Sequence, residues 1–198
     1  MIKKWLNRVF IDGLSGMAMG LFATLIVGTI ISQIGTIVGG ETGNYLVMMS
    51  SVAKVLTGAG IGVGVAHKYG ESPLVTVSAA SAGMIGAFAS KLLAGEVIVE
   101  GALHLTGAGE PLGAFIAAYV GIELGHLVSG KTKLDILVTP MVTILLGGMV
   151  GLFVGPPISQ FMAQLGAMIQ WGTEQQPFLM GIIVSVLMGM ILTLPISS

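Results

Sequence analysis

The chain has 198 residues, of which 54% are hydrophobic and only 9% are charged, and its formal net charge is −1. A water-soluble domain carries about 25% charged residues, so this composition and the mean hydropathy of +0.97 exclude one. The near-neutral charge gives no basis for nucleic acid binding, and the lack of cysteine excludes disulfides and thiolate chemistry. The sequence therefore predicts an integral membrane protein whose main partner is the lipid bilayer.

Six apolar segments are long enough to cross a bilayer, because a hydrocarbon core of about 30 Å requires about 20 helical residues. They are residues 13–38, 46–66, 74–93, 112–129, 136–155 and 178–196. Ser72-Pro73 and Glu110-Pro111 predict the starts of the third and fourth helices. Gly155-Pro156-Pro157 predicts the end of the fifth, because proline cannot continue a helical hydrogen-bond ladder. The predicted fold class is all-α, a polytopic transmembrane helix bundle of about six spans.

Two segments between the spans are predicted to be more than connections. Residues 94–110 combine apolar residues with many glycines, and residues 158–171 have apolar side chains at the spacing of one helix face. The spacing in residues 158–171 is typical of an amphipathic helix that lies in the interface or of a re-entrant segment. Irregular backbone at membrane depth survives only where protein or a water-filled cavity satisfies its polar groups.

The basic residues predict the orientation of the chain. If the chain crosses the membrane at every apolar segment, six of them fall on one side: Lys3, Lys4, Arg8, Lys68, Lys131 and Lys133. Loops on the other side are acidic. Because positive charge is retained in the cytoplasm, we expect the N-terminus to lie inside the cell.

Small residues recur at a spacing of four in most of the predicted spans, as in Gly16, Gly20, Thr24 and Gly28 or Gly147, Gly151 and Gly155. In lipid such stripes allow helix backbones to approach closely. We therefore interpret them mainly as packing surfaces. Smooth faces that slide during a transport cycle are a compatible alternative.

Glu123 and His126 are the ionisable residues of the fourth span, and their spacing of three places them on one helix face. Charged groups inside a bilayer are costly, so we expect both to point into the bundle. They form either a hydrogen-bonding or proton-coupled site for a polar solute or a structural pair near the cytoplasmic surface. Lys54, in the second span, either pairs with Glu123 or extends along its own helix. No metal is expected, because a di-metal carboxylate site needs a second Glu-x-x-His motif.

The segment Gly107-Ala108-Gly109-Glu110-Pro111 is the most informative motif. Its glycines permit a tight backbone, and its carboxylate sits where a helix begins, next to free N–H groups. Such a carboxylate accepts hydrogen bonds from solute hydroxyls or simply caps its helix, and the residues alone favour the cap. No phosphate-binding loop or Ser/His/Asp set is recognisable, so we expect neither a cofactor nor an enzyme acting alone.

Three stretches carry a family resemblance: residues 10–18 (FIDGLSGMA), 107–115 (GAGEPLGAF) and 134–140 (LDILVTP). They resemble the membrane EIIC proteins of the bacterial phosphotransferase system, in particular the perfringolysin-regulator-like group. The resemblance implies a permease fold in the bacterial cytoplasmic membrane, with a sugar held near re-entrant loops. Glucose-type members carry Gly-Ile-Thr-Glu-Pro, whose glutamate contacts sugar. Gly107, Glu110 and Pro111 match that motif, whereas Ala108 and Gly109 differ from it.

We therefore expect residues 1–198 to form a single transmembrane domain that binds or transports a small polar solute, with a sugar as the implied class. Such proteins usually have more than six spans, so we expect this chain to be the N-terminal part of a longer one. Expected partners are separate phosphocarrier proteins and a second copy of the chain in a dimer. The predicted solute-binding residues are Gly107, Glu110, Pro111, Glu123, His126 and Lys54.

Two other functions remain open at this stage. A membrane-embedded regulator or sensor with the same fold would bind solute without net transport. A membrane scaffold would pack through its glycine faces and have no solute site. In any of these cases the chain is at most the membrane subunit of a phosphotransferase system.

Overall fold

The computed structural model describes residues 6–99, 101–174, 181–182 and 185–186, and it confirms the all-α fold class. The helices are η1 (Asn7–Gly13), α2 (Leu14–Leu21), η2 (Phe22–Ile26), α3 (Val27–Val38), α4 (Gly40–Val55), α5 (Thr57–Lys68), α6 (Pro73–Ala87), α7 (Ala89–Leu93), α8 (Pro111–Val128) and α9 (Asp135–Glu174). Here η1 and η2 are π-helical stretches within one continuous helix. The strands β1 (Ile98–Val99) and β2 (Ala102–Leu103) form an antiparallel hairpin within the 94–110 segment.

The helices that could cross a membrane follow the predicted segments only in part. Within the described residues, three are long and apolar enough: Asn7–Val38, Pro111–Val128 and Asp135–Met168. A fourth crossing results if α4 and α5, which meet at a bend of 52°, are counted as one span. The predicted sixth span, 178–196, lies almost entirely outside the described residues.

Two predicted continuous spans are interrupted. The segment 46–66 bends at Leu56, where the Thr57 hydroxyl donates to the carbonyl oxygen of Lys54 at 2.6 Å and satisfies an acceptor at the bend. The segment 74–93 breaks at Phe88, which leaves the helical region (φ −108°, ψ 14°) and separates α6 from α7. Side-chain and loop contacts replace the helical hydrogen bonds at both breaks, and hydropathy alone does not report them.

The predicted end of the fifth helix at Gly155-Pro156-Pro157 is wrong. Helix α9 continues through both prolines to Glu174, so the 158–171 segment is the second half of α9 and not a separate helix. Proline removes helical donors, yet membrane helices tolerate it where neighbouring groups compensate. Helix α7 packs beside this part of α9, and the Ser90 hydroxyl donates to the Ser159 hydroxyl at 2.9 Å.

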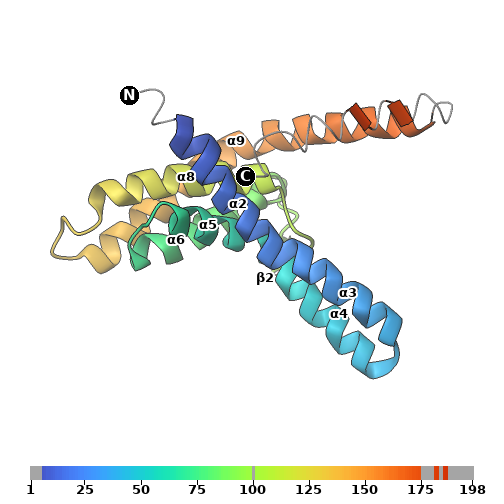
Figure 1. The fold of residues 1–198 in the computed structure, drawn as a ribbon. Coiled ribbons are helices and arrows are strands. Elements are labelled where there is room, and N and C mark those ends of the chain that lie inside the picture. Colours follow the sequence, from blue (N-terminus) through green and yellow to red (C-terminus); the bar gives the residue numbers. More distant parts are fainter. Residues whose placement is uncertain (1–5, 100, 175–180, 183–184, 187–198) are drawn as a thin grey trace.

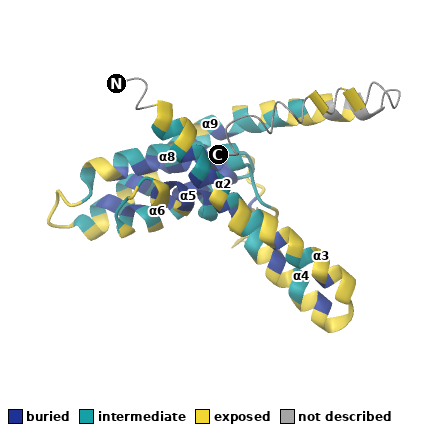
Figure 2. Ribbon diagram, viewed as in Figure 1, coloured by how far each residue is buried: buried dark blue, intermediate teal, exposed yellow. Residues whose placement is uncertain are grey.

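The helices form a compact body with two projections (Figure 1). Helices α2, α5, α6, α8 and the first half of α9 pack together, while the α3–α4 hairpin projects to one side and the second half of α9 to another. Buried residues gather in the body, whereas the α3–α4 hairpin is largely exposed (Figure 2). The large apolar side chains exposed on that hairpin fit a lipid environment.

Glycines make the closest contacts between neighbouring helices, which confirms the packing interpretation of the small-residue stripes. The pairs in contact are Gly16 with Gly64 (α2–α5), Gly58 with Gly83 (α5–α6), Gly86 with Gly113 (α6–α8) and Gly121 with Gly147 (α8–α9). At Gly16, a Cβ would lie only 2.7 Å from the carbonyl oxygen of Gly64. The helix backbones therefore meet directly, without side chains between them.

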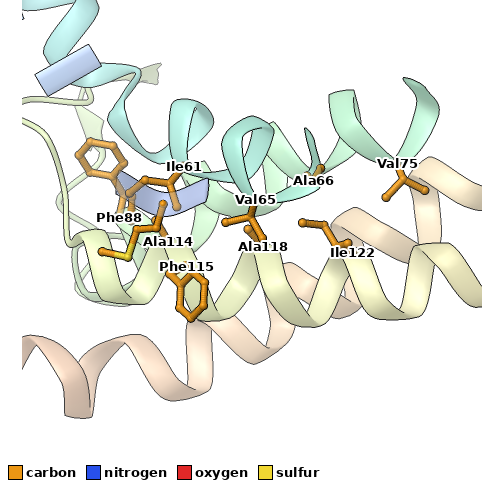
Figure 3. Close-up of a cluster of buried hydrophobic side chains, with 12 residues drawn as sticks. Ile61, Val65, Ala66, Val75, Phe88, Ala114, Phe115, Ala118 and Ile122 are labelled. Carbon is orange, nitrogen blue, oxygen red and sulfur yellow. The ribbon is translucent and has the colours of Figure 1, made fainter. Parts of the chain in front are cut away.

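The buried apolar core lies between these backbone contacts (Figure 3). Ile61 and Val65 from α5 face Ala118 and Ile122 from α8, and all four are fully buried. Phe88 fills the space at the α6–α7 break. Small and branched side chains dominate because the helix axes are too close for larger ones.

A glycine substitution tests this packing. Gly62→Ala places a Cβ within 2.6 Å of the Ala79 carbonyl carbon, a backbone atom that cannot give way. We expect a loss of unfolding free energy of about 1–3 kcal/mol from overpacking, measured as a lower thermal midpoint in detergent. Gly166→Ala is the matched control, because nothing lies within 4 Å of the added Cβ. An unchanged midpoint for Gly62→Ala would contradict the tight α5–α6 contact.

Candidate functional site

Four titratable side chains meet where the first helix, the α5–α6 connection and α8 come together. Arg8 Nε donates to Glu123 Oε1 at 2.7 Å, and Arg8 Nη2 lies 3.3 Å from Glu71 Oε1. His126 Nδ1 lies 2.8 Å from Glu71 Oε2. The Glu71 side chain is only 4% exposed, so its carboxylate depends on these two partners. We call these four residues the Arg8 cluster.

Tyr69 attaches Arg8 to the body of the protein a second time. The Arg8 guanidinium lies 4.2 Å from the centroid of the Tyr69 ring, and the Tyr69 hydroxyl donates to the Arg8 carbonyl oxygen at 2.9 Å. Tyr69 follows the last residue of α5, and burial raises the pKa of its phenol above the ordinary value. The hydroxyl therefore stays protonated and remains a donor. Stacking and hydrogen bonding together hold the start of the first helix against the α5–α6 connection.

A cavity of about 400 Å³ lies beside the Arg8 cluster. Its lining includes Glu71, Ser72, His126, Ser129 and Lys131. The hydroxyls of Ser72 and Ser129 lie 3.1 Å apart, so the start of α6 and the end of α8 meet here. The His126 side chain is 61% exposed and keeps one ring nitrogen available on this side. The region offers a polar surface next to charges that are already paired.

Glu123 and His126 lie on one face of α8, as their spacing predicts, and both belong to the Arg8 cluster. Glu123 pairs with Arg8 and not with Lys54. Lys54 lies in the last turn of α4, where its Cγ is 3.0 Å from the position of a Cβ on Gly28 of the first helix. Within the described part of the chain, Lys54 has no ion-pair partner. The geometry supplies a structural role for Glu123 and His126 and leaves their solute-binding role a prediction.

The Gly107–Pro111 segment is held against the break between α6 and α7. The Glu110 amide donates to the Ala87 carbonyl oxygen at 2.7 Å, an acceptor that the helix break leaves free. Gly109 adopts a positive φ of 70°, and a Cβ there would lie 2.7 Å from the same carbonyl oxygen. Glycine is therefore required at 109 for both its backbone angle and its close approach. Pro111 is the first residue of α8, as predicted.

Glu110 stands at the opposite end of α8 from the Arg8 cluster. Its side chain belongs to the loop before α8, and burial raises the pKa of its carboxyl, while the backbone amide of Leu112 partly offsets this. Thirteen residues separate Glu110 from Glu123 along the helix, or about 20 Å at 1.5 Å per residue. The structure therefore does not bring together the two halves of the predicted site.

Sequence reasoning missed three members of the charged region: Arg8, Tyr69 and Glu71. The sequence pattern used Arg8 only as one of the basic residues that predict the orientation of the chain, although it is the single arginine in the sequence. Glu71 immediately precedes the Ser72-Pro73 helix start and was not singled out. A lone arginine beside an apolar run was the available signal, because a charge near membrane depth requires a partner.

Comparisons with known proteins agree with the sequence resemblance. A family model described as phosphotransferase system, EIIC matches residues 11–198. Neither the curated proteins nor the solved structures that were searched contain a match.

Removing one member of the Arg8 cluster tests its structural role. Arg8→Gln leaves the buried Glu71 carboxylate with His126 alone, and we expect a loss of about 1–3 kcal/mol in unfolding free energy. The double variant Arg8→Gln/Glu71→Gln should recover part of this loss, because the buried charge is gone. Lys133→Gln is the control, since Lys133 is exposed. Unfolding in detergent is measured for wild type, Arg8→Gln, Glu71→Gln, the double variant and Lys133→Gln. Additive effects of the two cluster substitutions would show that these residues are not coupled.

Proposed function

The chain belongs to the phosphotransferase system EIIC family, and on this premise we propose that it binds and transports a sugar as the membrane component of a permease. We propose the bacterial cytoplasmic membrane as its location, with the N-terminus inside. Members of this system act together with phosphocarrier proteins, and we propose the cytoplasmic loops as the side that such proteins approach. The dimer expected from the sequence remains a proposal.

The proposal of solute binding rests on one observation: the end of α6 and the start of α8 meet beside Glu110. Helix α6 has 15 residues, a length of about 22 Å, whereas the hydrocarbon core is about 30 Å thick. If the α6 start lies at one membrane surface, its end at Ala87 and the attached Glu110 lie within the membrane. Transporters bind solutes at such interrupted helices, where free backbone groups and helix ends converge. The Glu110 carboxylate is then available to accept hydrogen bonds from sugar hydroxyls.

The loop contacts of the Arg8 cluster support the proposed orientation. Arg8, the 69–72 connection and the 129–134 connection all lie at one end of the body. Lys68, Lys131 and Lys133 belong to the same end, and a concentration of basic residues is typical of a cytoplasmic face. The 94–110 loop follows the other end of α6.

Loss of the Glu110 charge tests the site. We expect Glu110→Gln to weaken sugar binding about tenfold, because a hydrogen bond to a charged acceptor contributes roughly 1.5 kcal/mol. Equilibrium binding of glucose, N-acetylglucosamine, maltose and mannitol to protein in nanodiscs measures this. Glu41→Gln is the control, since Glu41 is exposed in the first turn of α4. Unchanged affinity in Glu110→Gln would remove Glu110 from the site.

The same protein in sealed proteoliposomes separates a permease from a regulator. Uptake of the bound sugar into the vesicles supports the permease. Binding without uptake supports the regulator or sensor that the sequence resemblance left open.

The stability of wild type relative to Glu110→Gln should depend on pH in a defined direction. Burial raises the pKa of the folded Glu110 carboxyl above its ordinary value of 4.5, so ionisation costs folding free energy. Below that ordinary value the residue is neutral in both states, and we expect wild type and Glu110→Gln to unfold at the same temperature. As pH rises through the raised pKa, wild type should lose stability relative to Glu110→Gln. Thermal midpoints between pH 4 and pH 8 check this, and a wild type that gains on the variant over this range would contradict it.

A further inference from the structure

A second cavity, of about 530 Å³, forms a groove between α7 and α9. Hydroxyl and amide groups of Ser90, Ser159 and Gln160 line it, together with apolar atoms of Leu93, Pro156 and other residues. Among the described residues, no charged side chain lines it. Its volume falls within the range of about 300–1,000 Å³ that small-molecule sites occupy. Neither the Arg8 cluster nor the Gly107–Pro111 segment contributes to its lining.

A break between two helices and a proline-containing stretch of a continuous helix meet at this groove. On one side, α6 breaks at Phe88 and α7 begins. On the other, α9 contains Pro156 and Pro157, which have no N–H, so the carbonyl groups one turn earlier lose their helical donors. The Ser90 hydroxyl donates to the Ser159 hydroxyl at 2.9 Å and joins the two sides. Irregular backbone such as the break at Phe88 persists in membranes where it lines a cavity, and discontinuous helices mark solute sites.

The groove is also close in the chain to the anchoring point of Glu110. The Glu110 amide donates to the Ala87 carbonyl oxygen, and Ser90 follows Ala87 by three residues across the break. The only charged residue of α7, Lys91, donates to the Thr106 carbonyl oxygen and does not line the groove. The groove and the Glu110 loop therefore share one short, broken stretch of helix.

We propose that this groove binds a neutral, polyhydroxylated solute through Ser90, Ser159 and Gln160; the assignment rests on the proposed sugar-binding function and adds a binding position separate from Glu110. The Ser90 hydroxyl already donates to the Ser159 hydroxyl, so Ser90 offers acceptor positions, while Ser159 offers its donor and a remaining acceptor position. The glutamine amide offers both donors and an acceptor, and together these groups match the hydroxyl groups of a sugar. The apolar lining fits the C–H faces of a sugar ring. A charged solute finds no counter-ion here and pays for its desolvation, so the groove selects for neutral sugars.

Single cysteines test the location, because the natural chain has none. In the full chain in nanodiscs, Ser159→Cys is labelled with N-ethylmaleimide in the presence of the neutral sugar that wild type binds best. We expect that sugar to slow labelling about fivefold or more at a concentration well above its dissociation constant. Gluconate and glucosamine, which carry charge, should not slow it. Ser51→Cys on the exposed side of α4 is the control, and its labelling should not change.

A second variant tests the location of the solute without introducing a cysteine into the groove. Gln160→Leu should weaken binding of the same sugar about threefold to tenfold, because one hydrogen bond is lost. Gln164→Leu, one turn further along α9 and exposed, is the control. The thermal midpoint of each variant shows whether it folds. If Gln160→Leu does not fold, the protection of Ser159→Cys by the sugar alone decides whether the groove binds solute.

The outcomes separate the groove from the proposed function. If wild type binds a sugar but Ser159→Cys is not protected and Gln160→Leu binds normally, the groove assignment is wrong and the proposed function stands. Protection by gluconate or glucosamine equal to that by the neutral sugar overturns the assigned solute class. If wild type binds no neutral sugar, both the groove assignment and the proposed function fall.

Discussion

Direct backbone contact at glycine is the constraint on which the rest of this structure depends. Helices α2, α5, α6, α8 and α9 meet in series through glycine pairs, and a Cβ at most of these positions would collide with a neighbouring carbonyl. Lipid supplies no hydrophobic drive between helices, so such packing is what holds them together. Close packing at glycine also determines which residues meet at the charged end of the body, where the Arg8 cluster lies. Gly13 lies so close to Tyr69 that a Cβ would be 2.7 Å from the tyrosine hydroxyl, and this proximity brings Arg8 to Glu71.

The two ends of α8 have different chemistry because different elements reach them. At one end Glu123 pairs with Arg8 from the first helix, and His126 contacts the Glu71 carboxylate from the α5–α6 connection, so both side chains already have partners. At the other end the Glu110 backbone is bonded to Ala87, and its carboxyl has no charged partner among the described residues. A paired charge stabilises a junction between helices, whereas an unpaired carboxylate remains available to a solute. This contrast is the reason for placing the solute near Glu110 and the groove, and not at the Arg8 cluster.

Local rules predicted the features that local chemistry determines. Both helix starts marked by proline are observed, and the Ser72 hydroxyl accepts from the Val75 amide as an N-cap. The same rules failed at Pro156 and Pro157, where α9 continues. They also failed at Leu56 and Phe88, which interrupt apolar segments that contain no proline. At the Phe88 break the Glu110 amide, from a loop 22 residues away, satisfies the Ala87 carbonyl oxygen, and a sequence window contains no record of that neighbour.

The sequence by itself determined that this is a membrane protein, that its fold class is all-α, and which family it resembles. Hydrophobicity, helix capping and short motifs are properties of neighbouring residues, so they can be recognised without a fold. Only the tertiary structure decided which charges are paired. Arg8 is separated from Glu71 by 63 residues and from Glu123 by 115. Such partners are brought together by the order in which helices pack, and that order follows from close glycine contacts distributed over the whole chain.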